Sequence, residues 1–341
     1  MTRHLLLLSA LLALAGGLRG QDPIFTQFYA APLTLSPAFA GNTYAPRIAL
    51  NYRNQWPAVV DGTTAFATYA ASYEQFLAPL NSGIGVLVKA DDAGGGMYKI
   101  NKFAVAYAYR IAVNEEFNLK IGLEAGGRQV SVDWDRLIFP DQLDPKNGPV
   151  IPTNELRPEV TNKTYFDVGA GLLAYGSTFY GGVSLKHLTT PDESLLDGNP
   201  ILNEGLALRL SVHAGAQFAL PHSPYSRGRW GGAFVSPNVL YIKQADQGQL
   251  NAGAYVSWGQ LFFGAWYRHA FTNPDAVIGL IGYQWEVFKV GYSYDFTVSE
   301  LAGAPSGGSH ELSLVINLDN SEKVRRRRQQ ERYNDCFKLF R

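Results

Sequence analysis

Hydrophobic and polar side chains alternate along much of the chain in short segments. In residues 288–299, six apolar or aromatic side chains are separated by Lys, Gly, Ser, Asp, Thr and Ser. Successive side chains of a β-strand point to opposite faces, so this pattern predicts a strand with one apolar face and one polar face. The segments 103–111, 117–124 and 311–318 alternate in the same way.

Fourteen segments have the character of strands, and most are about ten residues long, which is the length that a tilted strand needs to cross a bilayer. The segment that contains Pro237 is the weakest, because proline cannot donate to a strand ladder. The fourteen segments are 47–56, 64–73, 83–91, 99–112, 117–126, 164–175, 178–187, 205–219, 231–243, 250–258, 261–268, 276–284, 287–298 and 309–318.

Such strands fit either a soluble sheet, with apolar side chains inside, or a transmembrane barrel, with apolar side chains toward lipid. The lengths of the connections separate these alternatives. If the first strand begins in the periplasm, most connections after even-numbered strands are short, whereas those after odd-numbered strands include the two longest, 127–163 and 188–204. A soluble sandwich has no reason to sort connections in this way. The sequence therefore predicts an all-β fold, a transmembrane outer-membrane β-barrel of about 14 antiparallel strands over residues 47–318.

Residues 1–20 predict a signal peptide. Arg3 and His4 precede an apolar run at 5–15 that is too short to span a membrane, and cleavage after Ala15 or after Gly20 fits the small residues there. We therefore expect the chain to be exported and to be an integral protein of a bacterial outer membrane. This compartment excludes nucleic acid as a partner.

Two further segments lie outside the predicted strands. Residues 21–46 are too apolar for a free linker, and we expect them to form a plug inside the barrel or to pack against its periplasmic mouth. Residues 319–341 form a basic tail that we place in the periplasm, where acidic protein surfaces or anionic lipid would attract it. A solvated tail without a partner fits equally well. The tail contains the single cysteine, Cys336, so no disulfide can form within the chain.

The sequence contains no motif of a known catalytic or nucleotide-binding site, and we predict no enzyme, no cofactor and no metal. His213 is expected to form hydrogen bonds in the lumen. The polar faces carry charges of both signs, which favours a closed interior held by ion pairs over a selective channel. These residues are Arg53, Lys89, Arg110, Lys120, Glu124, Asp167, Lys186, Arg209, Arg268, Lys289, Asp295 and Glu311.

A specific pattern of residues follows the signal peptide. It consists of Asp22, Pro23, Gln27, Pro37, Ala38, Gly41, Tyr52, Arg53, Gln55 and Trp56, with His187, Leu188 and Pro191 further along the chain. These positions resemble the PorP/SprF family, outer-membrane components of the Bacteroidetes type IX secretion and gliding machinery. One departure is Ser36, where the family commonly has asparagine.

The resemblance implies a non-enzymatic barrel that supports secretion or surface attachment of cargo proteins, such as adhesins with a C-terminal sorting domain. It also implies periplasmic lipoprotein and peptidoglycan-binding components as partners, in addition to outer-membrane lipids. On this interpretation the connections 127–163 and 188–204 would contact cargo, while residues 21–41 and the tail would face the periplasm. The alternative is a passive outer-membrane transporter or channel for small, hydrophobic solutes.

Overall fold

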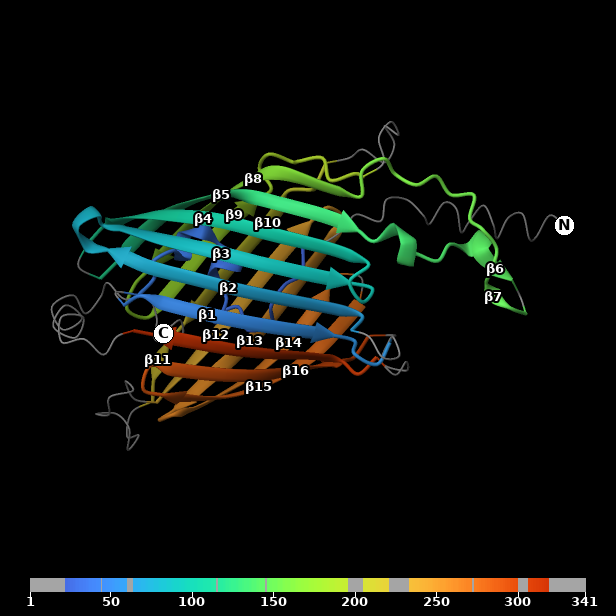
Figure 1. Ribbon diagram of the computed structural model, residues 1–341. Coiled ribbons are helices and arrows are strands. Elements are labelled where there is room, and N and C mark those ends of the chain that lie inside the picture. The colour runs from blue at the N-terminus through green and yellow to red at the C-terminus, as the bar shows by residue number, and fades with distance from the viewer. Residues whose placement is uncertain are drawn as a thin grey trace.

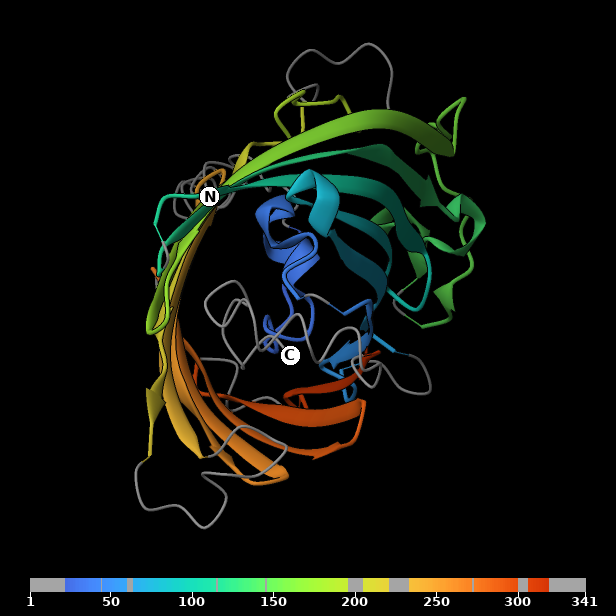
Figure 2. The same ribbon diagram turned by 90° about the vertical axis from the view of Figure 1, so that its left-hand side faces the viewer.

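The computed structural model describes residues 22–43, 45–59, 64–114, 116–144, 146–195, 205–220, 233–271, 273–299 and 306–318. These residues form a closed antiparallel barrel of 14 strands, which Figures 1 and 2 show from the side and from one end. The predicted fold class is therefore confirmed. The expected signal peptide, the basic tail with Cys336 and part of the connection 188–204 lie outside the described residues.

All fourteen predicted strand segments are strands, with ends that differ by a few residues. They follow one another around the wall in chain order, and β1 pairs with β17 while β10 pairs with β12, so the wall has no free edge. The strands are β1 (Arg47–Gln55), β2 (Phe66–Leu77), β3 (Ser82–Ala93), β4 (Tyr98–Ala112), β5 (Asn118–Val132), β8 (Asn162–Tyr175), β9 (Phe179–Lys186), β10 (Arg209–Ala216), β12 (Phe234–Gln244), β13 (Gln247–Trp258), β14 (Leu261–Ala270), β15 (Asn273–Trp285), β16 (Phe288–Thr297) and β17 (Ser309–Asn317).

The proline in β12 coincides with a break in the neighbouring strand. β10 pairs with β12 as far as Gly215 and Asn238, and pairing resumes in the two-residue strand β11 (Phe218–Ala219) opposite Val235. Pro237 lies within this interruption, where the ladder does not require its missing N–H. The hydroxyl of Ser236 donates to the carbonyl of Ala216 at 2.8 Å across the gap.

The two faces of the wall have the polarity of a membrane barrel. On β4, Phe103, Val105, Tyr107 and Tyr109 are 46–52% exposed, whereas Ala104, Ala106 and Ala108 between them are at most 4% exposed. The charged residues predicted for the polar faces point inward and are buried or half-buried. Apolar groups therefore cover the outside of the barrel, opposite to a soluble sheet. No helix in the described part of the chain is long and apolar enough to cross a membrane.

The connections differ at the two ends of the barrel. The end with the β5–β8 and β9–β10 connections is called the long-loop mouth below, and the opposite end, with η2 (Ala78–Leu80), the short-turn mouth. The β5–β8 connection contains η3 (Trp134–Arg136), η4 (Pro140–Gln142) and a hairpin of β6 (Leu143–Asp144) and β7 (Gly148–Pro149) that projects away from the barrel in Figure 1.

Candidate functional site

The lumen is occupied by the chain's own N-terminal residues. Residues 22–43, called the lumenal segment below, include the short helices α2 (Pro32–Leu35) and η1 (Pro37–Phe39) and lie within the ring of strands in Figure 2. Asp22 lies at the long-loop mouth, where it contacts the end of β5. Gly41 packs on Gly83 at the short-turn mouth. The segment thus runs along the lumen from one mouth to the other, and only its later part lies at the end that was expected to face the periplasm.

A cluster of charges holds the first residue of this segment. The Asp22 carboxylate lies 2.7 Å from the Arg128 guanidinium and 2.8 Å from Nε2 of His187, while Nδ1 of His187 lies 2.8 Å from Asp167. His187 follows the last residue of β9 and is fully buried. Burial disfavours its charged form, but the two carboxylates more than offset this and raise the pKa of His187. The imidazolium can then donate to both carboxylates at once.

Four cationic side chains of the wall donate to the backbone of the lumenal segment. An irregular segment leaves many carbonyl groups without a partner, and buried carbonyl groups need donors. Here the donors are long side chains that reach across the lumen over 2.6–3.2 Å. The pairs are Lys89 with Pro23, Arg47 with Tyr29 and Ala30, Lys186 with Leu33, and Lys120 with Ala40.

The acidic residues of the wall balance these cations and bind the segment as well. Glu311 accepts hydrogen bonds from the backbone N–H groups of Thr26 and Gln27, both at 2.8 Å. Arg53 lies between Glu311 at 3.4 Å and Asp295 at 3.0 Å. The Gln27 amide donates to the Glu311 carbonyl at 3.0 Å. Two positions of the family pattern, Gln27 and Arg53, therefore meet at one acidic cluster.

Small residues of the wall make room for η1. A Cβ atom added to Gly122 would lie 2.3 Å from the backbone nitrogen of Ala38, and one added to Gly171 would lie 2.3 Å from the Ser36 hydroxyl oxygen. These two glycines are direct partners on β5 and β8, and Ala108 on β4 is the other neighbour of Gly122. Together they form a groove in which Ala108 contributes the single methyl group, and the η1 backbone fits into it.

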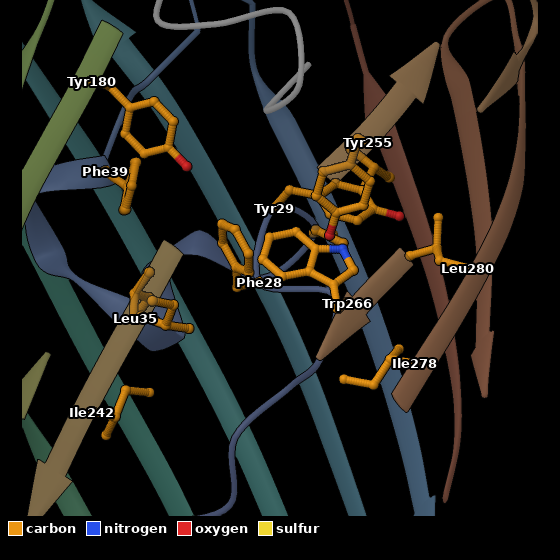
Figure 3. Close-up of a cluster of buried hydrophobic side chains, with 14 of the residues drawn as sticks. Phe28, Tyr29, Leu35, Phe39, Tyr180, Ile242, Tyr255, Trp266, Ile278 and Leu280 are labelled. Carbon is orange, nitrogen blue, oxygen red and sulfur yellow. The ribbon is translucent and has the colours of Figure 1, made fainter. Parts of the chain in front are cut away.

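Aromatic side chains pack the other side of the lumenal segment (Figure 3). The Phe28 ring meets the Trp266 ring edge-on at 5.2 Å, and the Tyr29 ring meets the Tyr255 ring at 4.8 Å. Ile278 and Leu280 of β15 belong to the same cluster. Such contacts stabilise beyond the area they bury. On this side of the barrel, the wall therefore presents apolar and aromatic side chains to the lumen, next to the polar inner faces of the other strands.

His213 also departs from its prediction. The expected hydrogen bonds are absent, since neither ring nitrogen has a partner among the described residues. Its ring instead lies against Phe39 of the lumenal segment, with 5.0 Å between the ring centroids. It belongs to the packing of the lumen and not to its hydrogen-bond network.

The structure brings most of the predicted family positions together and leaves three apart. Tyr52 lies beside Tyr69 at 5.0 Å between ring centroids. Leu188 and Pro191 lie on the β9–β10 connection, where Leu188 is 41% exposed and the Pro191 carbonyl accepts from Leu206 at 2.8 Å. The positions that lie in the lumen or line its mouth are Asp22, Pro23, Gln27, Pro37, Ala38, Gly41, Arg53, Gln55, Trp56 and His187.

A cavity of about 500 Å³ lies at the long-loop mouth, above the start of the lumenal segment. Asp22 and Ile24 line its inner end, and Gln55, Trp56 and Gln249 line its walls. Among the residues that the structure describes, no group of three His, Cys, Asp or Glu side chains is placed to hold a metal ion.

A closed strand wall with an apolar outer face and an occupied interior defines an integral outer-membrane β-barrel. A sequence model of the family described as Type IX secretion system membrane protein PorP/SprF matches residues 18–316. The chain therefore belongs to this family, which confirms the resemblance found in its N-terminal residues and makes it a membrane component of type IX secretion. No curated protein matches its sequence.

Several solved outer-membrane barrels are similar in shape at low sequence identity. The Ralstonia pickettii toluene transporter TbuX has a TM-score of 0.49 at 9% identity, over 85% of this chain and 94% of that one. Acinetobacter baumannii Omp33 has a TM-score of 0.45 at 8% identity, over 81% and 99% of the two chains. A Pseudomonas aeruginosa FadL homologue has a TM-score of 0.41 at 12% identity, over 83% and 94%.

Proposed function

We propose that this barrel supports secretion or surface attachment of cargo proteins, such as adhesins with a C-terminal sorting domain, without catalysing a reaction. Membership of a type IX secretion family supports a role in secretion. In this proposal the long-loop mouth faces the outside, and periplasmic lipoprotein and peptidoglycan-binding components contact the short-turn mouth. Residues 1–20 are removed as a signal peptide, and the basic tail 319–341 remains in the periplasm.

The observation that carries the cargo proposal is apolar surface on the β5–β8 connection. Ile138 and Val150 are each 62% exposed, and Leu156 is 85% exposed. These residues lie beyond the strand wall, on the connection that projects from the long-loop mouth in Figure 1. Leu143, Ile151 and Val160 of the same connection are exposed as well, and such an accumulation of apolar side chains outside the lipid-covered wall is typical of a surface that binds another protein. They support a docking role for the β5–β8 connection.

Replacing all three residues by serine tests this role. We expect cargo on the surface of intact cells, measured by antibody labelling, to fall at least about tenfold, because a few apolar anchors usually dominate a protein interface. The matched control replaces Val59 and Phe271, which are 56% and 59% exposed and lie on other connections of the same mouth, by serine. Barrel folding is checked for both by migration of unheated samples in gels. A wild-type amount of cargo on the surface of cells with the triple variant would exclude this docking role.

The transporter alternative predicts a different measurement. A passive pore requires an open path, whereas the lumenal segment and the aromatic cluster occupy the interior of this barrel. We therefore expect the purified protein to give no sustained conductance in a planar bilayer. Steady conductance or solute uptake by the intact protein would favour the transporter instead.

A further inference from the structure

The cavity at the long-loop mouth has hydrogen-bonding groups that the fold does not use. Gln55 on β1 and Gln247 and Gln249 on β13 line it, and their side chains form no hydrogen bond with another described residue. Each glutamine amide offers two donors and one acceptor oxygen. The cavity therefore presents free neutral amides from two separated parts of the wall.

The cationic side chains around this cavity are already paired, and the Asp91 carboxylate accepts a hydrogen bond from the Thr68 hydroxyl at 2.6 Å. Arg53 pairs with Asp295 and Glu311, and Arg128 pairs with Asp22 at 2.7 Å. Arg268 pairs with Asp275 and with Asp295. An anionic ligand would have to break one of these pairs, at the cost of an uncompensated buried charge. The free groups thus favour an uncharged ligand.

Aromatic rings form part of the same wall. Trp56 and Phe66 both line the cavity and meet edge-on, with 5.7 Å between ring centroids. The backbone of Trp56 has φ 56°, an unfavourable value for a bulky residue. Its N–H donates to the Gly308 carbonyl at 2.8 Å, which helps to hold this conformation. Strain of this kind is concentrated at functional sites.

We propose that this cavity binds a neutral saccharide. Side-chain amides can bond to two neighbouring hydroxyl groups of a sugar, and an aromatic face can pack on the C–H groups of its ring. A volume of about 500 Å³ is within the range of small-ligand sites. In the orientation proposed above, the cavity opens toward the cell exterior, where surface polysaccharides lie.

An extended peptide fits these observations less well. Peptides are commonly bound by addition to a free strand edge, and the closed wall offers none here. Capture of a C-terminal carboxylate would need an unpaired cation, and the three arginines that line the cavity are all paired. The groups that remain available are the glutamine amides, which can bond to the hydroxyl groups of a sugar, and the aromatic rings, which can pack on its C–H groups.

The test uses the full mature chain in a detergent without a sugar head group, such as lauryldimethylamine oxide, so that the detergent does not compete for the site. A microarray carries neutral bacterial oligosaccharides together with sialylated and sulfated glycans and extended peptides. We expect retention on at least one neutral oligosaccharide. By titration calorimetry, Gln55→Met and Gln249→Met should each weaken its binding about five- to tenfold, since each loses one or two hydrogen bonds but keeps its volume.

The matched control is Gln129→Met, which changes an exposed residue of β5 near the same mouth. Its affinity should equal that of the wild type. Binding of charged glycans or peptides alone, or no binding to any neutral glycan, would overturn the proposal. Equal affinity in both lumen-facing variants would overturn it as well. The site is separate from Ile138, Val150 and Leu156, so the saccharide and cargo experiments can fail independently.

Discussion

Substituting Gly122 by alanine tests whether the lumenal segment is held by the shape of the wall. The added Cβ would lie 2.3 Å from the nitrogen of Ala38 and 2.5 Å from the carbonyl carbon of Pro37. Ordinary contacts of a Cβ atom begin at 3.4 Å, so the η1 backbone must move by about 1 Å. Overpacking of this size costs about 1–3 kcal/mol. We expect the upper end of that range, because the atoms that the methyl group meets are backbone.

The surroundings of η1 leave little room for such a shift. Gly171 contacts Ser36 from the neighbouring strand, and Lys120 holds the Ala40 carbonyl at 2.6 Å. A displacement that relieves the clash at Gly122 therefore lengthens this hydrogen bond. The variant should keep its barrel, since the strand ladder is unchanged, but should hold the lumenal segment less tightly.

Limited proteolysis by chymotrypsin measures this loosening. The lumenal segment contains Phe and Tyr residues but no Lys or Arg, so chymotrypsin can cut it and trypsin cannot. Cleavage should be faster in Gly122→Ala than in the wild type. The rate should rise by about tenfold or more if the whole free-energy cost of overpacking favours release of the lumenal segment from the wall. Migration of unheated samples reports whether the barrel itself remains folded.

Gly127→Ala is the matched control for this experiment. It lies on the same strand, and a Cβ atom there meets nothing within 4 Å. Its segment should be cut no faster than that of the wild type. If Gly122→Ala also resists chymotrypsin like the wild type while its barrel is folded, then η1 does not dock in the glycine groove.

Three further changes probe the contacts of the lumenal segment. Lys186→Met removes the donor to the Leu33 carbonyl and one ion-pair partner of buried Glu124. It should lower the free energy of unfolding in urea by about 3–5 kcal/mol. An unchanged urea concentration at the midpoint of unfolding would contradict this. Trp266→Ala removes the edge-on contacts to Phe28 and Tyr255. It should lower the free energy of unfolding by about 3–5 kcal/mol in the same assay. A decrease well under 1 kcal/mol would show that the aromatic cluster is not tightly packed. The carboxylates of Asp22 and Asp167 outweigh burial and raise the pKa of His187, so its contribution is complete below its unfolded-state pKa of about 6.5 and is lost as the pH rises through the higher folded-state value. Chymotrypsin, normalised to a peptide substrate, should release the segment faster at pH 9 than at pH 6, and His187→Gln should reduce this difference.

The outer face of the barrel could be predicted from the sequence because lipid imposes a simple period of two. Phe103 to Tyr109 show this directly, since every second side chain faces outward. The inner face follows no such rule, because its partner is another segment of the same chain. Ile278 and Leu280 are apolar and point inward, although Val277 and Ile281 beside them are apolar and point outward. In the sequence, a strand that is apolar on both faces indicates that protein, and not water, fills this part of the lumen.

The individual contacts of the lumen could not be predicted. Alternation places Arg53 on the polar face, but its partner Asp295 is 242 residues away, and alternation gives no register between distant strands. The role of Gly122 is still harder to interpret from the sequence. A glycine within a strand suggests weakness or a bulge, or close approach of another backbone, and only the path of residues 22–43 shows that the third meaning applies.

The charged lining of the lumen has a physical origin that differs from ion conduction. A barrel of about eight strands can be filled by its own side chains, whereas one of 14 strands is wider and needs additional material inside. The lumenal segment supplies this material, but its irregular backbone carries carbonyl groups that need donors from the wall. Lysine and arginine reach these groups from the wall, and Glu74, Glu124 and Glu311 compensate the resulting charge. Charges of both signs in a wide barrel therefore indicate a held segment as readily as they indicate a channel. Conductance measured before and after removal of residues 22–43 separates the two meanings.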